Sequence, residues 1–298
     1  MNVLVTGGAG FIGSNLVERL LKDGHNVTVI DNLSTGKREN LQTNAEFLQL
    51  DIADLAAIKP AFQGKEIVFH VAALPRISRS IENPSETFRS NVTGTLNTLL
   101  AARDAGVKRV VYSASSSAYG IQSKLPLSES MAVKPLSPYG LSKYVGEELC
   151  WEFTDLYGLD TISLRYFNVY GSRMDMEGDY ATVIGKFLRQ KAEGRRLTIC
   201  GDGRQTRDFT NVADVVEANI LASRIGKGNG EVVNIGMGDN HSVLEIADII
   251  GGEHTFIPER QGEVRDTVAD ISKAKRILGW EPRISLQDGI KGLVTRNP

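Results

Sequence analysis

Short runs of Val, Ile and Leu recur along the first half of the chain, separated by longer segments of mixed polarity. Nearly every position in these runs is apolar, whereas a strand with one face in water would alternate apolar and polar residues. The pattern therefore predicts strands that are covered on both faces. The predicted strands are residues 2–6, 26–31, 46–51, 66–70, 108–113 and 161–166.

The segments between these runs carry apolar residues at three- and four-residue spacing, which is the period of an amphipathic helix. The period is clear in residues 17–21, 85–105 and 139–157. Regular alternation of strand and helix predicts an α/β fold, a doubly wound parallel sheet of the Rossmann-like kind.

The alternation loosens after Tyr166, where a polar stretch with Gly and Asp occupies 171–180. We place a boundary near residue 167, with a Rossmann domain at 1–167 and a smaller C-terminal α/β domain at 168–298. An apolar run at 231–236 has the composition to return to the main sheet.

Composition narrows the class of protein and its partners. The 298 residues are 41% apolar and 23% charged, which is typical of a globular protein. A net charge of −2 with scattered Lys and Arg argues against nucleic acid as a partner. Two cysteines, Cys150 and Cys200, fit a reducing cytoplasm. We find no basic leader and no run of about 18 apolar residues, so we expect a cytoplasmic protein without a membrane partner.

Glycines at a three-residue spacing follow the first predicted strand directly. Gly7 permits a tight turn, Gly10 lets backbone N–H groups approach a pyrophosphate, and Gly13 lets the next helix lie close to the sheet. The N-terminus of that helix then faces the anion. Because strand, turn, helix, second strand and acid occur in this order, the segment predicts a dinucleotide site.

The acid is Asp31, which ends the second predicted strand about 18 residues after Gly13. A carboxylate at this place accepts hydrogen bonds from the adenosine ribose hydroxyls and repels a 2′-phosphate. Asp31 therefore favours NAD over NADP, although Lys37 and Arg38 nearby keep NADP open. Asp51 and Ile52 end the third strand, where they could contact the adenine; equally, Asp51 could cap a helix at 54–61.

Tyr139 and Lys143 lie four residues apart in a segment that Pro138 prepares to begin a helix. Both side chains then share one face. A tyrosine has a pKa near 10, so it acts as a base at neutral pH only beside a positive charge, such as Lys143 or an oxidised nicotinamide. The serine-rich segment Ser113-Ala114-Ser115-Ser116-Ser117 ends the fifth strand at the edge where such sheets bind ligands.

Together these features resemble the extended short-chain dehydrogenase/reductase family, and the likeness is nearest to the nucleotide-sugar 4-epimerases. The resemblance covers nearly the whole chain. The segments that carry it are TGGAGFIG at 6–13, DNLSTG at 31–36, HVAA at 70–73, NVTGT at 91–95, SASSSAYG at 113–120, YGLSK at 139–143, RYFNVYG at 165–171, GDGRQTRDF at 201–209 and the stretch from Arg260 through ADISKAKRILGW at 269–280.

The resemblance implies a function for each matching residue. Ser115 matches the catalytic serine or threonine, Tyr139 the base and Lys143 its partner. The UDP-sugar substrate would be held by Ser115, Tyr139, Asn168, Arg207, Arg260, Glu263 and Thr267. The NAD cofactor would be contacted by Gly7, Gly10, Phe11, Ile12, Gly13, Asp31, Asn32, Ser34, Thr35, Gly36, Asp51, Ile52, Val71, Ala72, Ala73, Asn91, Ser113, Tyr139, Lys143 and Tyr166.

The residues after Ser115 bear on the type of reaction. Related dehydratases carry an Asp-Glu pair just after the catalytic threonine, and related decarboxylases carry a Glu; this chain has Ser116 and Ser117. Without a carboxylic acid, elimination of water lacks its acid/base partner, so epimerisation at C4 is favoured over dehydration or decarboxylation. A non-catalytic NAD-binding protein is a third alternative, which the intact Ser115, Tyr139 and Lys143 argue against.

Two positions differ from relatives. Thr267 stands where some galactose-specific members carry a bulky tyrosine, so larger N-acetylated sugars would have room. Pro75 stands where long members place a lysine near the substrate phosphates, and Arg76 is a candidate to replace it.

The resemblance also implies a homodimer that pairs the helices near 88–105 and 139–157 into a four-helix bundle. No metal is expected, because the histidines lack the spacing of ligands. They are His25, His70, His241 and His254.

Overall fold

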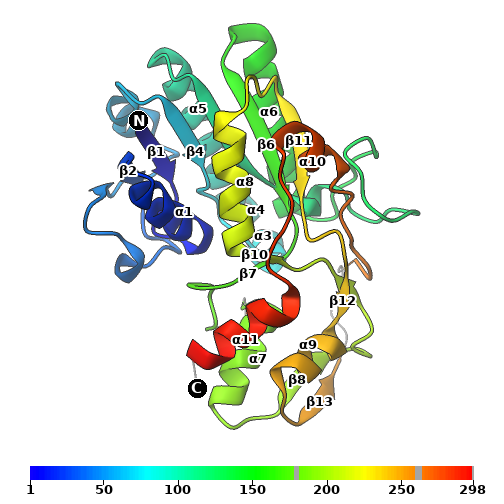
Figure 1. The fold of residues 1–298 in the computed structure, drawn as a ribbon. Helices are drawn as coiled ribbons and strands as arrows, with labels where there is room; N and C mark the ends of the chain where they lie inside the picture. The colour runs from blue at the N-terminus through cyan, green and yellow to red at the C-terminus, as the bar shows by residue number, and fades with distance from the viewer. Residues whose placement is uncertain (178–180, 259–263, 297–298) are drawn as a thin grey trace.

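The computed structural model describes residues 1–177, 181–258 and 264–296. A seven-stranded sheet forms the centre of the larger part of the molecule (Figure 1). Its strand order is β11–β6–β5–β4–β1–β2–β3, and all neighbouring strands run parallel. The strands are β1 (Asn2–Thr6), β2 (Asn26–Ile30), β3 (Glu46–Leu48), β4 (Ile67–His70), β5 (Arg109–Ser115), β6 (Asp160–Tyr166) and β11 (Glu231–Ile235).

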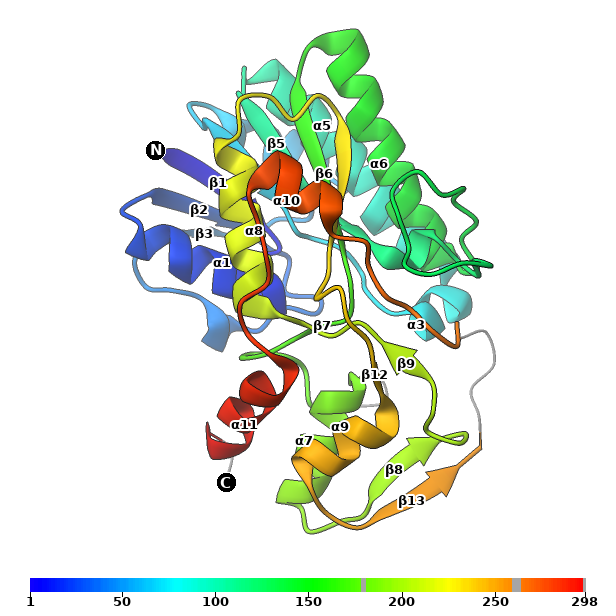
Figure 2. The same cartoon turned by 45° about the vertical axis from the view of Figure 1, so that its right-hand side comes forward.

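Helices cover both faces of this sheet (Figure 2). Val3 and Val5 of β1 pack on one face with α1, α8 and α10, whereas Leu4 packs on the other with α2, α5 and α6. All three side chains are fully buried, which explains the absence of polar alternation in the sequence. The doubly wound fold is thus confirmed. Its helices are α1 (Phe11–Lys22), η1 (Arg38–Asn40), α2 (Leu55–Ile58), η2 (Lys59–Phe62), α3 (Ile77–Glu82), α4 (Pro84–Phe88), η3 (Arg89–Thr93), α5 (Gly94–Asp104), η4 (Ser116–Ala118), α6 (Pro138–Tyr157), α8 (Val212–Arg224) and α10 (Ser272–Leu278).

The later half of the chain also contributes to this sheet. The run predicted to return there is strand β11, which pairs with β6 so that Val233 lies opposite Leu164. Helix α8, which precedes β11, packs against α1. The division of cofactor and substrate roles at residue 167 stays a prediction.

A smaller α/β part lies below the carboxyl edge of the sheet in Figure 1. Its core is formed by side chains of α7, α9 and α11, such as the fully buried Phe187, Ile246 and Ile290. Its strands form pairs β10–β7, β12–β9 and β13–β8. The elements are β7 (Val169–Tyr170), α7 (Val183–Ala192), β8 (Leu197–Cys200), β9 (Thr206–Arg207), β10 (Thr210–Asn211), β12 (His241–Ser242), α9 (Val243–Ile250), β13 (His254–Ile257) and α11 (Leu286–Arg296).

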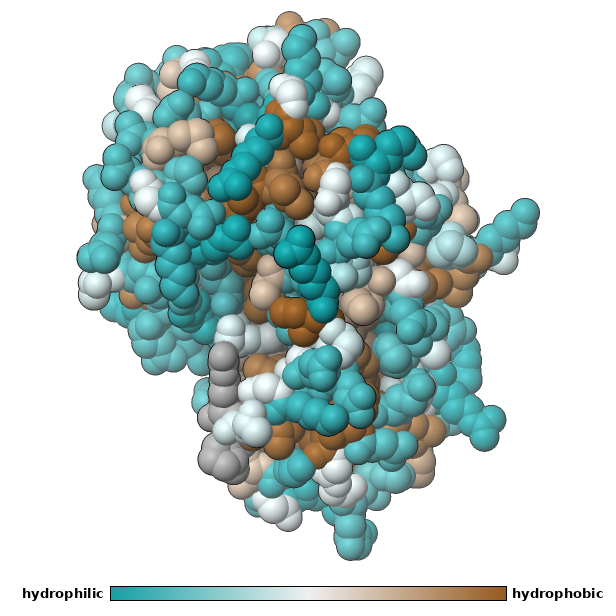
Figure 3. All heavy atoms as spheres, in the orientation of Figure 1, coloured by the Kyte–Doolittle hydropathy of each residue, from teal (hydrophilic) through white to brown (hydrophobic). Residues whose placement is uncertain are grey.

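Hydrophilic side chains cover most of the face drawn in Figure 3, and hydrophobic ones show between them as smaller patches. This agrees with helices whose apolar faces point to the sheet. Within the described ranges, no helix has both the length and the apolar character needed to span a membrane.

The helix predicted at 85–105 is present as one continuous helical segment, in which α4, a π-helical turn η3 and α5 follow one another without a break. The sequence did not predict the π-helical turn. The side chain of Asn91, within η3, accepts a hydrogen bond from the Leu74 amide at 2.7 Å and donates one to the Leu74 carbonyl at 3.1 Å. These contacts hold Asn91 inward, and Thr95 Oγ1 donates to the Asn91 carbonyl, so the helix widens locally at a buried polar contact.

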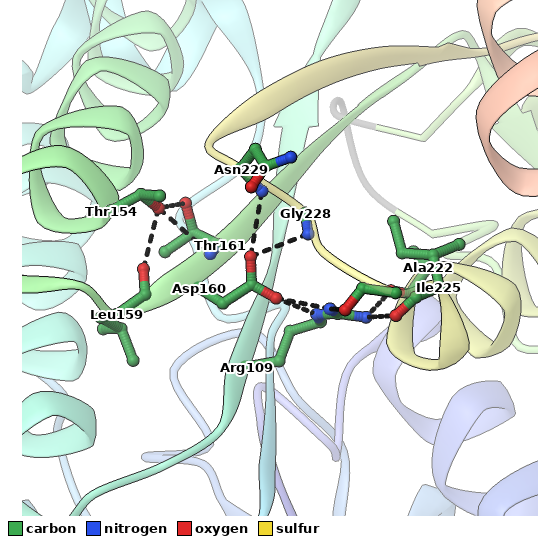
Figure 4. A network of polar contacts seen from close by, with 10 residues as sticks. Arg109, Thr154, Leu159, Asp160, Thr161, Ala222, Ile225, Gly228 and Asn229 are labelled. Carbon is green, nitrogen blue, oxygen red and sulfur yellow. Dashed lines mark hydrogen bonds and ion pairs between the residues drawn. The ribbon is translucent and has the colours of Figure 1, made fainter.

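At the opposite, amino end of the sheet, Arg109 of β5 forms an ion pair with Asp160 of β6 (Figure 4). This pair connects the two strands to the segment between α8 and β11. The Arg109 guanidinium pairs with Asp160 Oδ2 and also donates to the carbonyls of Ala222 and Ile225 at the end of α8. Asp160 Oδ1 accepts from the Gly228 amide at 2.7 Å. The pair therefore fixes where α8 ends and where β11 begins.

Strand order reverses at β1, which lies between β2 and β4. Chain connections on the two sides of this point leave in opposite directions, so a crevice opens at the carboxyl ends of β1 and β4. The fold thus directs a ligand to the residues that follow these two strands.

Candidate active site

A cleft of about 730 Å³ opens at that switch point. One wall consists of the glycine turn after β1, the loop after β4, the end of β5 and the start of α6. The smaller part of the chain closes the other side, where Asn168, Arg207 and Thr267 line the cleft. Residues from both halves of the chain therefore meet around one cavity.

The glycine turn leaves backbone bare where a pyrophosphate would approach. Gly7 has φ of +74°, and a Cβ on Gly13 would lie 2.1 Å from the Gly7 carbonyl oxygen, so only glycine fits there. Gly10 and Gly13 line the cleft together with Phe11, the first residue of α1. The N-terminus of α1 therefore opens onto the cavity, and this geometry fits a bound dinucleotide.

Asp31, the residue predicted to bind the adenosine ribose, lines the cleft beside the glycine turn. Its carboxylate is nearly buried, and accepts hydrogen bonds from the Ala9 amide at 3.0 Å and from the Leu33 amide at 2.8 Å. Burial raises the pKa of Asp31, and the two amide hydrogen bonds oppose that rise. The amides fix the direction of a carboxylate that lines the cleft, as recognition of ribose hydroxyls requires.

The two cations near Asp31 lie differently. Arg38 donates to Gln49 Oε1 at 2.6 Å and lies over the Phe47 ring, so its charge is directed to β3. Lys37 is exposed and lines the cleft.

Most of the other residues expected to contact the cofactor also line the cleft. They are Ile12, Asn32, Ser34, Thr35, Ile52, Val71, Ala72, Ala73, Ser113 and Tyr166. Gly36 lies behind Asp31, since a Cβ there would be 2.8 Å from Asp31 Oδ1. Asp51 is held by Arg89 at 2.8 Å. The alternative in which Asp51 caps the next helix is wrong, because Asp54 accepts the capping bond from the Ala57 amide.

Tyr139 lies in the first turn of α6, which begins where the Ser137 side chain accepts from the Gly140 amide at 3.1 Å. The half-buried phenol lines the cleft. Burial raises the pKa of Tyr139, while a hydrogen bond with Ser115 and the positive charge of Arg76 oppose that rise. Ser115, at the end of β5, is nearly buried. Its hydrogen bond with Tyr139 shows that the structure brings these two predicted catalytic side chains together.

Lys143 lies one turn further along α6 and is 4% exposed. Its Nζ donates to the backbone carbonyl of Ser113 at 2.7 Å and lies over the Tyr112 ring. Burial lowers the pKa of Lys143 to about 8, opposed by the negative charge of Glu147. This cation is desolvated and fixed within the wall of the cleft.

Asn91, expected to contact the cofactor, lies behind this wall. It is 1% exposed, and its Nδ2 donates to Ser142 Oγ at 3.0 Å. Ser142 Oγ in turn donates to the Tyr139 carbonyl at 2.8 Å. Asn91 therefore connects the loop after β4 to the turn of α6 that carries Tyr139.

A buried ion pair lies beneath Lys143. Glu147 of α6 accepts two hydrogen bonds from Arg165 of β6, at 2.9 and 2.6 Å. Burial raises the pKa of Glu147, which the Arg165 charge opposes. Sequence reasoning missed this pair, although Glu147 follows Lys143 by one helical turn.

The structure describes some of the residues predicted to bind the substrate. Asn168 is exposed on the cleft, and Arg207 donates to the carbonyls of Thr206 and Arg265 at 2.9 and 2.7 Å. Thr267 Oγ1 is buried beside the cleft without a hydrogen-bond partner in the described part of the chain. Arg260 and Glu263 lie outside the described residues.

The sequence indicates Arg76 only as a candidate to replace the lysine that relatives carry at position 75. In the structure it lines the cleft and acts electrostatically on Tyr139. Its position directly after β4, at the edge where such sheets bind ligands, is the feature of the sequence that could have indicated a place in the cleft.

Among the residues that the structure describes, no group of His, Cys, Asp and Glu has the arrangement of a metal site. His70 is buried between the hydroxyls of Thr6 and Thr95, at 2.7 and 2.9 Å. Burial lowers the pKa of His70 to about 3, so this imidazole is a neutral part of the core.

Comparison with known proteins identifies relatives of the whole chain. Residues 3–236 match the family described as the NAD dependent epimerase/dehydratase family. A putative UDP-glucose 4-epimerase of Methanocaldococcus jannaschii is 43% identical over 98% of this chain and 97% of its own. A UDP-glucuronate 4-epimerase of Thermodesulfobacterium geofontis is 38% identical over 98% and 94%.

Among solved structures, that of a UDP-glucose 4-epimerase from Thermotoga maritima with UDP-glucose is similar over 99% of this chain and 98% of its own, with a TM-score of 0.95 and 41% identity. The resemblance found in the sequence is thereby confirmed. The assignment to a family rests on sequence similarity over nearly the full length, on the shared fold and on the glycine turn beside Asp31. The chain belongs to the NAD dependent epimerase/dehydratase family, and NAD is its cofactor.

Proposed function

We propose that the protein is an epimerase that inverts C4 of a UDP-linked hexose through a transient 4-keto sugar. The observation that carries this is the Tyr139 phenol, which lines the cleft in contact with Ser115 and one turn from Lys143. Such a group can hold and move a proton at a sugar hydroxyl beside a dinucleotide. The similar UDP-glucose 4-epimerases support UDP-glucose and its C4 epimer as substrates.

Bound NAD supplies a reversible hydride acceptor, so C4 can be oxidised and then reduced in one cleft. Tyr139 as phenolate accepts the proton of the C4 hydroxyl, with the Ser115 hydroxyl in the hydrogen-bond path. On return, Tyr139 donates that proton to the oxygen on C4. The positive charge of Lys143 stabilises the phenolate throughout.

Inversion requires that the keto sugar presents its other face. Asn168, Arg207 and Arg260 hold the nucleotide and diphosphate, so the sugar turns about its diphosphate linkage while the rest stays bound. A forked guanidinium suits phosphate oxygens. The roles of Arg260 and Glu263 rest on the sequence alone.

A nucleotide-sugar dehydratase or decarboxylase is the rival enzyme. Ser116 and Ser117 line the cleft just after Ser115, and neither hydroxyl can replace the carboxylic acid of those enzymes. A protein that only binds NAD is the remaining alternative. A buried lysine beneath a cleft-facing phenol supports catalysis over binding alone.

The test is incubation of the NAD-loaded protein with a panel of UDP- and dTDP-sugars, followed by chromatography and mass spectrometry. We expect C4 epimers of unchanged mass and no stoichiometric release of reduced cofactor. A product lighter by water or carbon dioxide would establish the rival enzyme. Absence of any product, with NAD bound, would favour the binding protein.

We also propose that N-acetylated sugars are accepted, because Thr267 leaves room at C2 where a tyrosine would not. The experiment is direct comparison of UDP-galactose and UDP-N-acetylgalactosamine. Turnover of the first with none of the second would refute this breadth.

We propose that residues 1–167 bind NAD and 168–298 bind the nucleotide sugar, in a cytoplasmic homodimer built from α5 and α6. These helices pack side by side, and α6 leaves Trp151, Leu156 and Tyr157 exposed by 52%, 66% and 53%. Exposed aromatic and aliphatic residues on one helix support a protein interface. Light scattering of the purified protein is expected to give the dimer mass; a monomer would contradict the interface.

A further inference from the structure

Arg76 is a cation of the cleft that the proposed chemistry does not use. It lies in the loop between β4 and α3 and lines the cavity together with Tyr139. Its backbone has φ of +95° and ψ of 126°, which a residue with a side chain adopts only where its surroundings hold it. The loop therefore keeps this side chain at the cleft despite local strain.

The guanidinium of Arg76 forms no hydrogen bond or ion pair within the described residues. Other arginines of the cleft differ: Arg79 pairs with Glu86 at 3.1 Å, and Arg173 pairs with Glu18. Arg207 donates to two backbone carbonyls. The guanidinium of Arg76 is therefore half-buried at the wall of the cavity with its donors available to a ligand, and a bound anion would pair with them.

Its place in the cleft indicates which part of a substrate it meets. Arg76, Tyr139 and Asp175 line the same cleft, and the charge of Arg76 interacts with both of the other side chains. In the proposed reaction the Tyr139 phenol lies at C4 of the hexose, so a cation that interacts with this phenol across the same cleft is placed to meet the hexose. The carboxylate group is the anion that matches a guanidinium fork with two parallel hydrogen bonds.

We propose that Arg76 binds a carboxylate on the hexose, so that an acidic sugar nucleotide such as UDP-glucuronate is a substrate of this site. The proposal rests on the proposed function, because it uses the same phenol and the same orientation of the sugar. It assigns to one residue the choice between neutral and acidic hexoses.

The test compares the NAD-loaded full chain with two variants. Arg76→Gly removes the cation and suits the positive φ, whereas Arg79→Gln removes a neighbouring cation that already has a partner. For each protein, kcat/KM is measured with UDP-glucuronate and with UDP-glucose. We expect the ratio of the two values to fall about 10- to 100-fold in Arg76→Gly and to stay unchanged in Arg79→Gln. The ratio does not depend on the fraction of folded protein.

Calorimetry with UDP-glucuronate and with UDP supplies a readout independent of turnover. We expect Arg76→Gly to weaken binding of UDP-glucuronate and to leave that of UDP as it is. An equal loss for both ligands would place Arg76 at the diphosphate and overturn the inference, as would an unchanged kinetic ratio. Arg76-dependent binding of UDP-glucuronate without C4 inversion of either sugar would instead support the carboxylate site and refute the proposed function.

Discussion

Lys143 donates a 2.7 Å hydrogen bond from Nζ to the backbone carbonyl of Ser113, and so joins helix α6 to the end of strand β5. These two elements carry Tyr139, the predicted base, and Ser115, the predicted catalytic serine. This hydrogen bond therefore fixes α6 and β5 relative to each other. It also holds the buried charge of Lys143 close to the two predicted catalytic side chains.

The buried charge makes the reaction sensitive to alkaline pH. Burial lowers the pKa of Lys143 to about 8, so Lys143 loses its proton as the pH rises through that value. Because the phenolate needs the cation, we expect kcat/KM to fall above a pH of about 8. Glu147 raises the pKa of Lys143, so Glu147→Gln is expected to move this limb to lower pH. Glu148→Gln is the control, since Glu148 is exposed one position further on.

The position of the limb in a pH profile of kcat/KM decides this point. It does not change with the fraction of active protein, which matters because Glu147→Gln also removes the partner of buried Arg165. An alkaline limb at the same pH in Glu147→Gln and in the parent would refute the electrostatic role of Glu147.

Tyr139→Phe removes the hydroxyl and little else. We expect kcat to fall by about 10²- to 10⁴-fold, the usual contribution of general acid/base catalysis. NAD affinity, measured by fluorescence titration, is expected to stay nearly unchanged. Tyr144→Phe changes a tyrosine of the same helix outside the cleft and is expected to retain activity. Retention of activity in Tyr139→Phe would refute the assignment of the base.

The glycine turn can be tested with a single methyl group. A Cβ at position 13 would lie 2.1 Å from the Gly7 carbonyl oxygen, so Gly13→Ala must displace α1 from the sheet. We expect loss of NAD binding and a lower free energy of unfolding. Gly292→Ala, in α11, meets no atom within 4 Å and is expected to be neutral or stabilising by up to about 1 kcal/mol. Equal NAD affinity in the two variants would refute the role of the turn.

The Arg109–Asp160 ion pair is expected to stabilise the folded protein at the amino end of the sheet. Arg109→Ala leaves a carboxylate and the carbonyls at the end of α8 without their partner, so we expect a loss of about 3 kcal/mol in the free energy of unfolding. Lys22→Ala breaks an exposed pair with Glu18 and is expected to cost below about 1 kcal/mol. Denaturant titration measures both. A loss no larger for Arg109→Ala than for Lys22→Ala would contradict the role of this network.

The sequence predicted most of what depends on local pattern. Strands such as β1 are readable because burial on both faces leaves Val3, Leu4 and Val5 apolar in succession. The pairing of Tyr139 with a cation is readable because four residues make one helical turn. Both features depend only on residues that are close in sequence.

What the sequence did not predict depends on contacts between distant segments. The π-helical turn at Asn91 arises from hydrogen bonds to Leu74, 17 residues earlier. Asp51 pairs with Arg89, 38 residues away, and the N-cap of α2 is Asp54 instead. The position of Arg76 in the same cleft as Tyr139 depends on how the loop after β4 packs against α6, which the local sequence does not show.

The central claim is that hydrogen leaves C4 of the sugar and returns to the same carbon. It is tested most directly with UDP-glucose that carries deuterium at C4, incubated with the NAD-loaded protein in ordinary water. We expect the C4 epimer to retain the deuterium at C4, seen by mass spectrometry and NMR. Replacement of that deuterium by solvent hydrogen, or a product of lower mass through loss of water, would contradict the account.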